Sequence, residues 1–243
     1  MKTVLITGAS RGIGRELALA FGRAGYAVGV NYAKEHAAAE AVVQEIWEAG
    51  NKEAEAFPCD VRDSIKVRQM VDSMVVRWKR LDVLVNNAGI TRDRTILKMS
   101  NGEWNDVIDV NLNGAFWCLR EAARIMSQQK SGAIINISSI MAVRGGFGNA
   151  NYAAAKAGLI ALTKGAAREL GRFHITVNAV LPGFHATDMG SALDEEQRQQ
   201  VIAENVLGHT TLMGDLTRLV LEVAQNTSLS GQVFNADSRV ISG

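Results

Sequence analysis

The sequence predicts an α/β fold in which about seven parallel strands form one doubly wound sheet, with helices on both of its faces. Short apolar runs rich in β-branched residues alternate along the 243 residues with longer segments that carry apolar side chains at three- and four-residue spacing. The first run also leads directly into a glycine-rich turn at the start of an amphipathic segment. Both observations are typical of βαβ units.

The predicted strands are short enough to cross a sheet once. They are Thr3–Thr7, Ala27–Asn31, Ala54–Phe57, Val83–Asn86, Ala133–Ile137, Thr176–Leu181 and Gln232–Asn235. The segments between them are rich in helix-forming residues, and the predicted helices are Gly14–Ala24, Ala37–Ala49, Ser64–Trp78, Glu103–Met126 and Ala153–Leu170. Because each crossover can be helical, consecutive strands can run parallel.

The whole chain, residues 1–243, is expected to form one domain. No repeat or Pro/Ser-rich linker divides it, and its two prolines, Pro58 and Pro182, lie at strand ends. The content of 47% hydrophobic and 21% charged residues is that of a soluble globular protein. The 26 Lys and Arg residues nearly balance the 25 Asp and Glu residues, so the total charge favours neither nucleic acid nor a membrane as partner.

The sequence also favours a cytoplasmic location. The N-terminal apolar run stops at Gly8, which is too short for a signal peptide or a membrane span. Cys59 and Cys118 form no framework that would indicate secretion and disulfides. The four histidines lack metal-ligand spacing, so no metal site is predicted.

The glycine-rich turn TGASRGIG at 7–14 predicts a phosphate site. Its glycines let the backbone approach a pyrophosphate at the N-terminus of the following helix, which makes the predicted fold Rossmann-type. A purely structural turn is the alternative, because glycine is common between strands and helices. On the cofactor interpretation, the binding residues in this turn are Gly8, Ser10, Arg11, Gly12, Ile13 and Gly14.

The residues after the second strand indicate which dinucleotide is bound. A site selective for NAD usually has an acidic side chain there, which binds both ribose hydroxyls. This sequence instead reads Asn31, Tyr32, Ala33 and Lys34, with the arginine of the glycine-rich turn nearby. A 2′-phosphate would meet cations, so NADP(H) is the predicted cofactor. The alternatives are solvated surface cations without such a role, or a Glu35 that turns toward the ribose.

Tyr152 and Lys156 are four residues apart in an alanine-rich segment, so a helix places them on one face. The strand at Ala133–Ile137 delivers Ser138 and Ser139 to the same edge of the sheet. Reduction of a ketone needs a hydride donor, a proton donor and a group that stabilises the developing alkoxide. Tyr152 could donate the proton, and an ammonium ~5 Å away would lower its pKa by about two units. Taken singly, each residue has an ordinary structural interpretation as a turn, a cap or a solvated side chain.

Taken together, these residues resemble the short-chain dehydrogenase/reductase family, with TGASRGIG at 7–14, NNAG at 86–89, serine at 139 and YAAAK at 152–156. The resemblance implies that Ser139, and not Ser138, is catalytic, and that Asn111 completes a tetrad with Tyr152 and Lys156. The resemblance also implies that Tyr152 and Lys156 contact the cofactor. The remaining implied contacts are Asp60 and Val61 at the adenine, Asn86, Asn87, Ala88 and Gly89 along the cleft, and Pro182, Gly183 and Thr187 at the nicotinamide carboxamide.

Within that family, the stretches ITRDRTILKM, NANYAAAKAGLI and ITVNAVLPGFHATDM most resemble bacterial 3-oxoacyl-carrier-protein reductases. The resemblance implies NADPH-dependent reduction of a 3-oxoacyl thioester, carried on acyl carrier protein or CoA, with Tyr152 as general acid. It also implies a homotetramer built through the regions of Glu103–Met126 and Ala153–Leu170. Lys130 and Arg172 are candidate cations for an acidic carrier protein, although solvated charge is their ordinary interpretation.

The last quarter of the chain departs from this pattern. The stretch GHTTLMGD at 208–215 lacks the arginine and proline usual in the family, and Ala236-Asp237-Ser238-Arg239 stands where Val-Asp-Gly-Gly is expected. A reductase of a specialised lipid, polyhydroxyalkanoate or polyketide pathway fits this departure. Two other classes stay open: a dehydrogenase for a sugar, steroid or aromatic ketone, and a noncatalytic protein that binds NADP.

Overall fold

The computed structural model describes residues 1–185 and 195–241, and in it seven parallel strands form one sheet. The strand order is β3-β2-β1-β4-β5-β6-β7. Their bounds are β1 (Thr3–Ile6), β2 (Ala27–Tyr32), β3 (Ala54–Pro58), β4 (Val83–Asn86), β5 (Gly132–Ile137), β6 (Ile175–Leu181) and β7 (Val233–Asn235). Each predicted strand is present, and the predicted doubly wound parallel sheet is confirmed.

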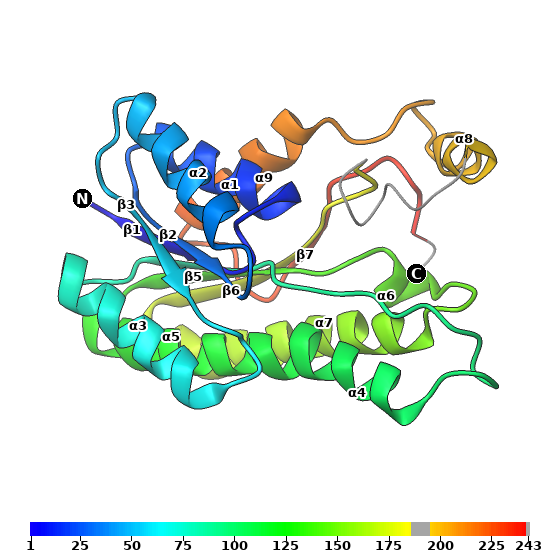
Figure 1. The fold of residues 1–243 in the computed structure, drawn as a ribbon, viewed down its shortest axis with the longest axis horizontal. Coiled ribbons are helices and arrows are strands. Elements are labelled where there is room, and N and C mark those ends of the chain that lie inside the picture. Colours follow the sequence, from blue (N-terminus) through cyan, green and yellow to red (C-terminus); the bar gives the residue numbers. More distant parts are fainter. Residues whose placement is uncertain (186–194, 242–243) are drawn as a thin grey trace.

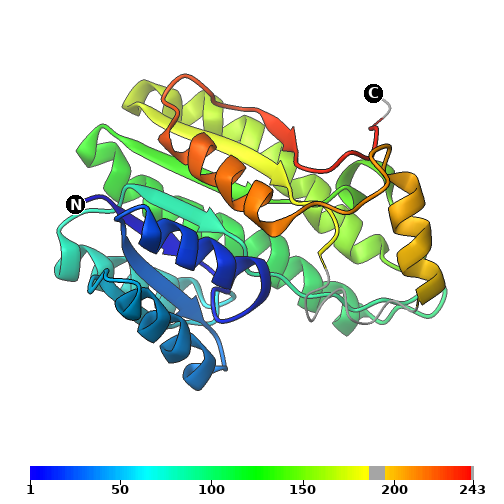
Figure 2. The same cartoon turned by 90° about the horizontal axis from the view of Figure 1, so that it is seen from above.

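Helices cover both faces of the sheet (Figures 1 and 2). One face carries α1 (Gly12–Arg23), α2 (His36–Glu48) and α9 (Met213–Gln225), and the other carries α3 (Ser64–Trp78), α5 (Ala115–Gln129) and α7 (Ala150–Leu170). Each layer buries its own apolar cluster against the sheet. Along β1, Val4 and Ile6 belong to one cluster and Leu5 to the other, because successive side chains of a strand point to opposite faces.

The predicted helix at Glu103–Met126 is interrupted. It consists of α4 (Asn101–Ile108), a π-helical segment (Asp109–Gly114) and α5. Ser100 begins α4 with a capping box, in which its hydroxyl accepts a hydrogen bond from the N–H of Glu103 and the Glu103 carboxylate accepts one from the N–H of Ser100. The predicted helices do not include α6 (Met141–Arg144), the 3-10 turn at Gly171–Phe173, α8 (Glu195–Glu204) or α9.

The topology fixes where a site can form. The chain builds β1, β2 and β3 in one direction and then returns to place β4 on the other side of β1. Ligands of such sheets bind at this reversal, beyond the carboxyl ends of the strands. At that edge α6 and α8 extend past the sheet (Figure 1).

Candidate active site

The glycine-rich turn lies at the reversal between β1 and β4. Gly8 has a φ of +63°, and a Cβ there would lie 2.9 Å from the Cα of Ala88, in the segment after β4. Gly12 begins α1 with a φ of +57°. A Cβ on Gly14 would overlap the carbonyl oxygen of Gly8. The turn therefore has no side chains at these positions, and its backbone is accessible. A phosphate-binding turn at a helix N-terminus requires this.

Thr7, which the sequence argument did not single out as a site residue, fixes this turn to the segment after β4. Its hydroxyl accepts hydrogen bonds from the N–H groups of Asn87 and Ala88, both at 3.0 Å. The Asn87 amide donates to the carbonyl oxygens of Thr7 and Gly8, at 2.9 and 3.1 Å. These hydrogen bonds thus join two segments that are about 80 positions apart in the sequence. The only signal in the sequence was a hydroxyl residue directly before the first glycine.

Asn31 supports the turn from inside the sheet. Its amide oxygen accepts a hydrogen bond from the N–H of Gly8 at 3.2 Å, and its NH₂ donates to the carbonyl oxygens of Phe57 and Cys59 at 3.1 and 3.0 Å. The next residue, Tyr32, is buried, and its hydroxyl contacts the His36 ring at 2.8 Å. The side chain of Asn31 therefore acts on the turn, while the exposed cation at this strand end is Lys34.

The segment after β3 carries Asp60 and Val61. The carboxylate of Asp60 accepts hydrogen bonds from the Arg62 side chain at 2.6 to 3.1 Å, and these hydrogen bonds lower the pKa of that carboxyl group. Val61 is buried, and a Cβ on Gly114 would lie 2.6 Å from its Cγ2. The segment after β3 is therefore in direct contact with the π-helical segment.

Tyr152 and Lys156 both lie on α7, as their spacing predicts, with Nζ of Lys156 5.6 Å from the centroid of the Tyr152 ring. Lys156 is only 4% exposed, and Nζ donates a hydrogen bond to the carbonyl oxygen of Ile137 at 2.7 Å. Burial lowers the pKa of Lys156 to about 8. The end of β5 thus holds this ammonium in a dry position beside the tyrosine.

The expected lowering of the Tyr152 pKa is wrong for this arrangement. Burial raises the pKa of the Tyr152 hydroxyl, a hydrogen bond with Ser139 opposes the rise, and the charge of Asp93 adds to it. The expectation rested on the ammonium of Lys156, whereas the largest effect on the Tyr152 pKa is the burial of the phenol. A raised pKa keeps Tyr152 protonated at neutral pH, as a proton donor must be.

The two serines after β5 have different surroundings. Ser138 is buried, and its hydroxyl donates to the carbonyl oxygen of Lys156 at 2.9 Å. Ser139 hydrogen-bonds the Tyr152 side chain, and its hydroxyl also accepts from the N–H of Met141 at 3.2 Å. Ser138 therefore joins β5 to α7, whereas Ser139 lies at the tyrosine.

Asn111 lies in the π-helical segment and is 1% exposed. Its amide oxygen accepts from the N–H of Ile90 at 2.8 Å, and its NH₂ donates to the carbonyl oxygen of Ile90 at 2.9 Å. A Cβ on Gly89 would lie 3.2 Å from the Asn111 amide oxygen and 3.7 Å from Nζ of Lys156. The segment after β4, Asn111 and Lys156 therefore meet at one point.

Asn86, by contrast, belongs to the core. It is 3% exposed, and its NH₂ donates to the Ala115 carbonyl oxygen and to the Asn136 side chain. Asn136 in turn donates to the hydroxyl of Thr163 at 2.8 Å. These side chains join β4 and β5 to α7 beneath the site. No spacing in the sequence predicts this network.

On the far side of the site, the loop after β6 begins with Pro182 and Gly183. Gly183 has a φ of +81°, and a Cβ there would collide with Thr211 and lie 2.8 Å from the Cβ of Asp237. The His185 ring hydrogen-bonds the carbonyl oxygen of Pro182 at 2.8 Å, and burial lowers the pKa of that ring. The predicted contact residue Thr187 lies outside the described residues.

Within residues 1–185 and 195–241, no three His, Cys, Asp or Glu side chains are grouped so that they could hold a metal ion. In the same part of the chain, no helix combines the length and the apolar character needed to cross a membrane.

Comparison with known proteins identifies the family. The model of a family described as "short chain dehydrogenase" matches residues 2–198. The chain belongs to this family. Its members are oxidoreductases that interconvert CH–OH and C=O groups, so the protein is an oxidoreductase of this kind.

Curated relatives and a solved structure agree with this family. The chain is 46% identical over 238 residues to the 3-oxoacyl-[acyl-carrier-protein] reductase FabG of Staphylococcus aureus (strain Mu50 / ATCC 700699), covering 97% of this chain and 96% of that protein. It is 44% identical over 240 residues to the 3-oxoacyl-[acyl-carrier-protein] reductase of Synechocystis sp. (strain ATCC 27184 / PCC 6803 / Kazusa), covering 99% and 97%. A crystal structure described as "a putative gluconate dehydrogenase from agrobacterium tumefaciens" has a TM-score of 0.95 and 30% identity, covering 100% and 96%.

Proposed function

We propose that the protein uses NADPH to reduce a 3-oxoacyl thioester to the 3-hydroxyacyl thioester, with Tyr152 as general acid. The observation that carries the proposal is the convergence of Tyr152, Ser139, Lys156 and Asn111 beside the glycine-rich turn. The similarity to reductases named for 3-oxoacyl-[acyl-carrier-protein] supports the substrate class.

The residues present fit a dinucleotide. Side chains are missing where a pyrophosphate would approach, because Gly8 and Gly14 leave no room for a Cβ. The exposed Arg11 and Lys34 favour a 2′-phosphate, and no acidic residue occupies the end of β2. When bound, the reduced nicotinamide supplies the hydride. The other proposed contacts are Ser10, Gly12, Ile13, Asn31, Tyr32, Ala33, Asp60, Val61, Asn87, Ala88, Gly89, Pro182, Gly183 and Thr187.

Each catalytic side chain has a separate task in the proposed reaction. Tyr152 donates its proton to the oxygen of the ketone, and Ser139 donates a hydrogen bond to the same oxygen as negative charge develops there. Lys156 keeps one donor on the carbonyl oxygen of Ile137 and has two more for ribose hydroxyls. Asn111 fixes the backbone at Ile90 and orders a water molecule that resupplies the proton.

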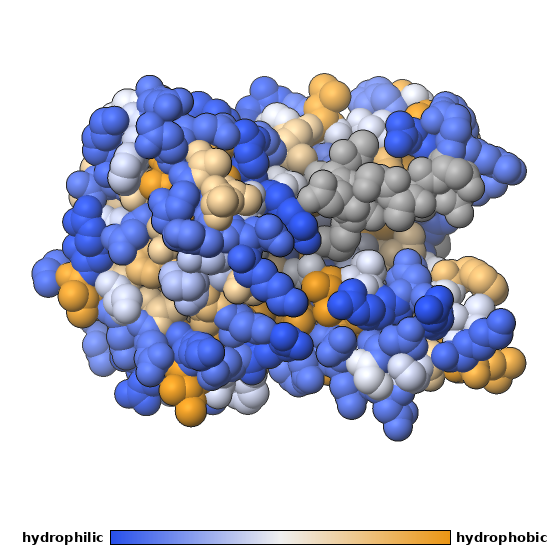
Figure 3. Space-filling view, in the orientation of Figure 1, coloured by the Kyte–Doolittle hydropathy of each residue, from blue (hydrophilic) through white to orange (hydrophobic). Residues whose placement is uncertain are grey.

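The entrance of the site suits an acyl chain. Leu97 and Phe147 are 97% and 95% exposed, on the loops before α4 and after α6. A hydrogen bond of 2.7 Å from the N–H of Arg94 to the carbonyl oxygen of Gly148 joins these loops. Figure 3 shows apolar side chains at this edge of the molecule, next to a recess. Exposed apolar side chains at the entrance favour an apolar substrate over a sugar.

The proposed carrier and oligomer are linked. Lys130 and Arg172 both lie over the ring of Phe173, at 4.6 and 4.7 Å from its centroid, and form a cationic surface for an acidic carrier protein. This surface lies at the amino ends of β5 and β6, at the opposite edge of the sheet from Tyr152. A carrier bound there would lie away from the Tyr152 of the same subunit, so the proposed carrier surface depends on the proposed homotetramer.

An exposed aromatic surface on α4 and α5 supports the same oligomer. Trp104 and Phe116 are 40% and 37% exposed, and Arg120 lies over the rings of Phe116 and Trp117. Exposed aromatic side chains are enriched at protein interfaces. The location proposed for the assembled enzyme is the cytoplasm.

One assay tests cofactor, substrate and proton donor together. Oxidation of NADPH is followed with acetoacetyl-CoA and with an acetoacetyl carrier protein, for the wild type and for Tyr152→Phe. Loss of the general acid is expected to lower kcat by about 10²- to 10⁴-fold. Tyr26→Phe controls for loss of a phenol hydroxyl elsewhere in the protein, because the Tyr26 ring packs against Phe21 of α1. Equal rates in Tyr152→Phe and the control would exclude Tyr152 as proton donor.

A dehydrogenase of a non-thioester substrate is the second candidate. The structural similarity to the protein described as a gluconate dehydrogenase supports it. Oxidation of gluconate with NADP⁺, in the absence of any thioester reduction, would replace the first proposal with this one. Tight NADPH binding without turnover of any ketone would indicate a noncatalytic protein.

A further inference from the structure

The end of α8 is attached to the rest of the protein from two sides. Glu204, the last residue of α8, accepts hydrogen bonds from Arg144 at 2.8 and 3.3 Å. The next residue, Asn205, is 4% exposed and accepts a hydrogen bond from the hydroxyl of Ser238 at 3.1 Å. These adjacent residues thus have partners 60 and 33 positions away in the sequence.

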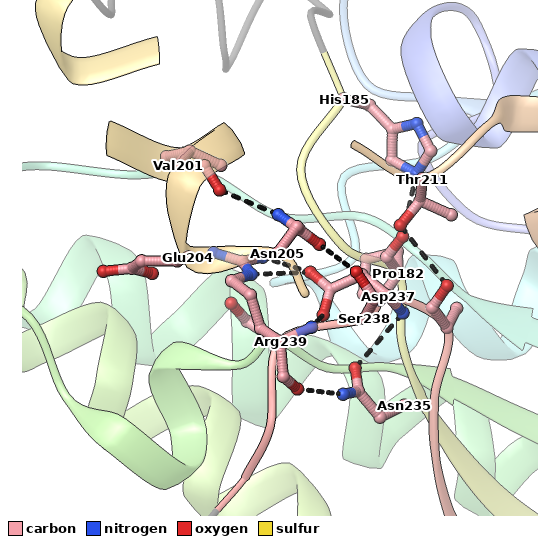
Figure 4. A network of polar contacts seen from close by, with 12 residues as sticks. Pro182, His185, Val201, Glu204, Asn205, Thr211, Asn235, Asp237, Ser238 and Arg239 are labelled. Carbon is pink, nitrogen blue, oxygen red and sulfur yellow. Dashed lines mark hydrogen bonds and ion pairs between the residues drawn. The ribbon is translucent and has the colours of Figure 1, made fainter. Parts of the chain in front are cut away.

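A buried ion pair fixes the segment that carries Ser238 (Figure 4). Nε and Nη2 of Arg239 lie 2.7 and 2.5 Å from Oδ2 of Asp237, and the two side chains are 5% and 1% exposed. Asn235 donates to the carbonyl oxygen of Arg239 at 2.9 Å. Separating this pair would leave an uncompensated buried charge, which disfavours other arrangements of the segment. Ser238, which also accepts from the N–H of Leu207 at 3.3 Å, is therefore held in one position facing α8.

The same C-terminal segment touches the loop beside the catalytic residues. Asp237 packs against the backbone of Gly183, where a Cβ would lie 2.8 Å from the Cβ of Asp237. The N–H of Ala236 donates to the carbonyl oxygen of Leu181 at 2.9 Å. On the other side, Arg144 ends α6, the short helix that follows Ser139. The two attachments thus come from different segments beside the site, α6 and the C-terminal segment. Both contact the end of α8.

We propose that Arg144 and Ser238 are positioning residues, which fix the end of α8 at the entrance of the site and thereby set the affinity for the acyl thioester. The identity of that substrate rests on the proposed function. Neither side chain touches the reacting atoms, so both act on substrate binding and not on proton transfer. Ser238 and Arg239 stand where the resemblance to bacterial 3-oxoacyl-carrier-protein reductases predicts two glycines, which would carry no side chains for these contacts.

Steady-state kinetics test the attachment of α8 through Arg144 and Glu204. Arg144→Gln is expected to raise KM for the acetoacetyl thioester about two- to fivefold, as for loss of an exposed ion pair, with kcat and NADPH affinity unchanged. The charge exchange Arg144→Glu with Glu204→Arg is expected to restore KM. Arg77→Gln is the matched control, because Arg77 pairs with Glu53 at 3.2 Å and is 48% exposed, against 41% for Arg144.

Ser238→Ala tests the attachment through Ser238 and Asn205 in the same way. Loss of the hydrogen bonds of the Ser238 hydroxyl is expected to raise KM about fivefold. Amide hydrogen exchange gives a second measurement that needs no substrate. Both variants are expected to speed exchange in α8 and Asn205–Leu207 and to leave α7 unchanged.

Unchanged KM in both variants overturns the inference, even if exchange in α8 is faster, because the attachments are then purely structural. Unchanged exchange overturns it as well. A wild-type protein that reduces no acyl thioester refutes the proposed function and the substrate named here, while the exchange measurement still decides whether the attachments hold α8.

Discussion

Replacing Lys156 by methionine should abolish activity and, at neutral pH, stabilise the protein. Methionine has nearly the length of lysine but carries no charge. The folded protein lowers the pKa of Lys156 from 10.5 to about 8, which corresponds to about 3 kcal/mol for burying its charge. The variant avoids that cost but loses the hydrogen bond to the carbonyl oxygen of Ile137, worth about 1 kcal/mol. A net gain of about 2 kcal/mol is expected below pH 8.

The stability difference between wild type and Lys156→Met should depend on pH. Below pH 8 Lys156 is protonated in both the folded and the unfolded state, so the folded protein bears the whole cost of the buried charge. Between pH 8 and 10.5 the unfolded state binds more protons than the folded state, so wild-type stability from this group rises with pH. Above 10.5 the lysine is neutral in both states and the cost has disappeared. The stability that Lys156→Met gains over wild type should therefore shrink between pH 8 and 10.5. Above pH 10.5 the variant should be less stable than wild type, because it lacks the hydrogen bond to Ile137.

Urea unfolding of wild type and variant across that pH range, at one protein concentration, measures the difference. Lys164→Met controls for loss of a positive charge, because Lys164 lies on the same helix and is exposed. A stability difference between wild type and Lys156→Met that stays constant with pH would refute the reasoning.

Three further predictions use the same physical arguments. Asn111→Ala leaves the N–H and C=O of Ile90 without partners, so it should lower the free energy of unfolding by about 2 kcal/mol in urea titrations and reduce kcat. Gly8→Ala should weaken NADPH binding at least about tenfold in fluorescence titrations, whereas Gly25→Ala, with a φ of +80° and open space around it, should leave binding unchanged. Because burial raises the pKa of Cys59 to about 11, its thiol should react with a disulfide reagent at mildly alkaline pH only after unfolding; labelling of the folded protein would contradict this.

The sequence predicted the features that depend on local spacing. The strands β1, β2, β4, β5 and β6 are buried on both faces of the sheet and are nearly continuous apolar runs, which made them easy to find. The edge strands β3 and β7 are only partly buried, and shorter β-rich runs indicated them. The shared face of Tyr152 and Lys156 follows from four-residue spacing on a helix. By contrast, α8 has the sequence EEQRQQVIAE, whose few apolar residues form no stripe that would predict a helix. The pKa of Tyr152 depends on its burial by distant segments, so it could not be judged from its neighbours in the sequence.

Asn111 shows most clearly why the rest could not be predicted. The segment Glu103–Met126 has helical spacing throughout, and nothing in that pattern indicates that residues 109–114 form a π-helix. A π-turn contains more residues than an α-turn, so it changes which side chains face the neighbouring segments. In this chain Asn111 contacts Ile90 on the catalytic side, while Gly114 touches Val61 on the side assigned to the adenine.

The contact at Gly114 explains the position of the π-turn. A Cβ at Gly114 would lie 2.6 Å from Cγ2 of Val61 and 3.2 Å from its carbonyl oxygen, so only glycine allows this helix to approach the segment after β3. Asn111 is held three residues earlier by both backbone groups of Ile90. These two contacts hold the middle and the last residue of the π-helical segment against two neighbouring segments. The geometry of Asn111, the proposed fourth catalytic residue, therefore depends on residues 50 and 21 positions away from it, in the segments after β3 and β4.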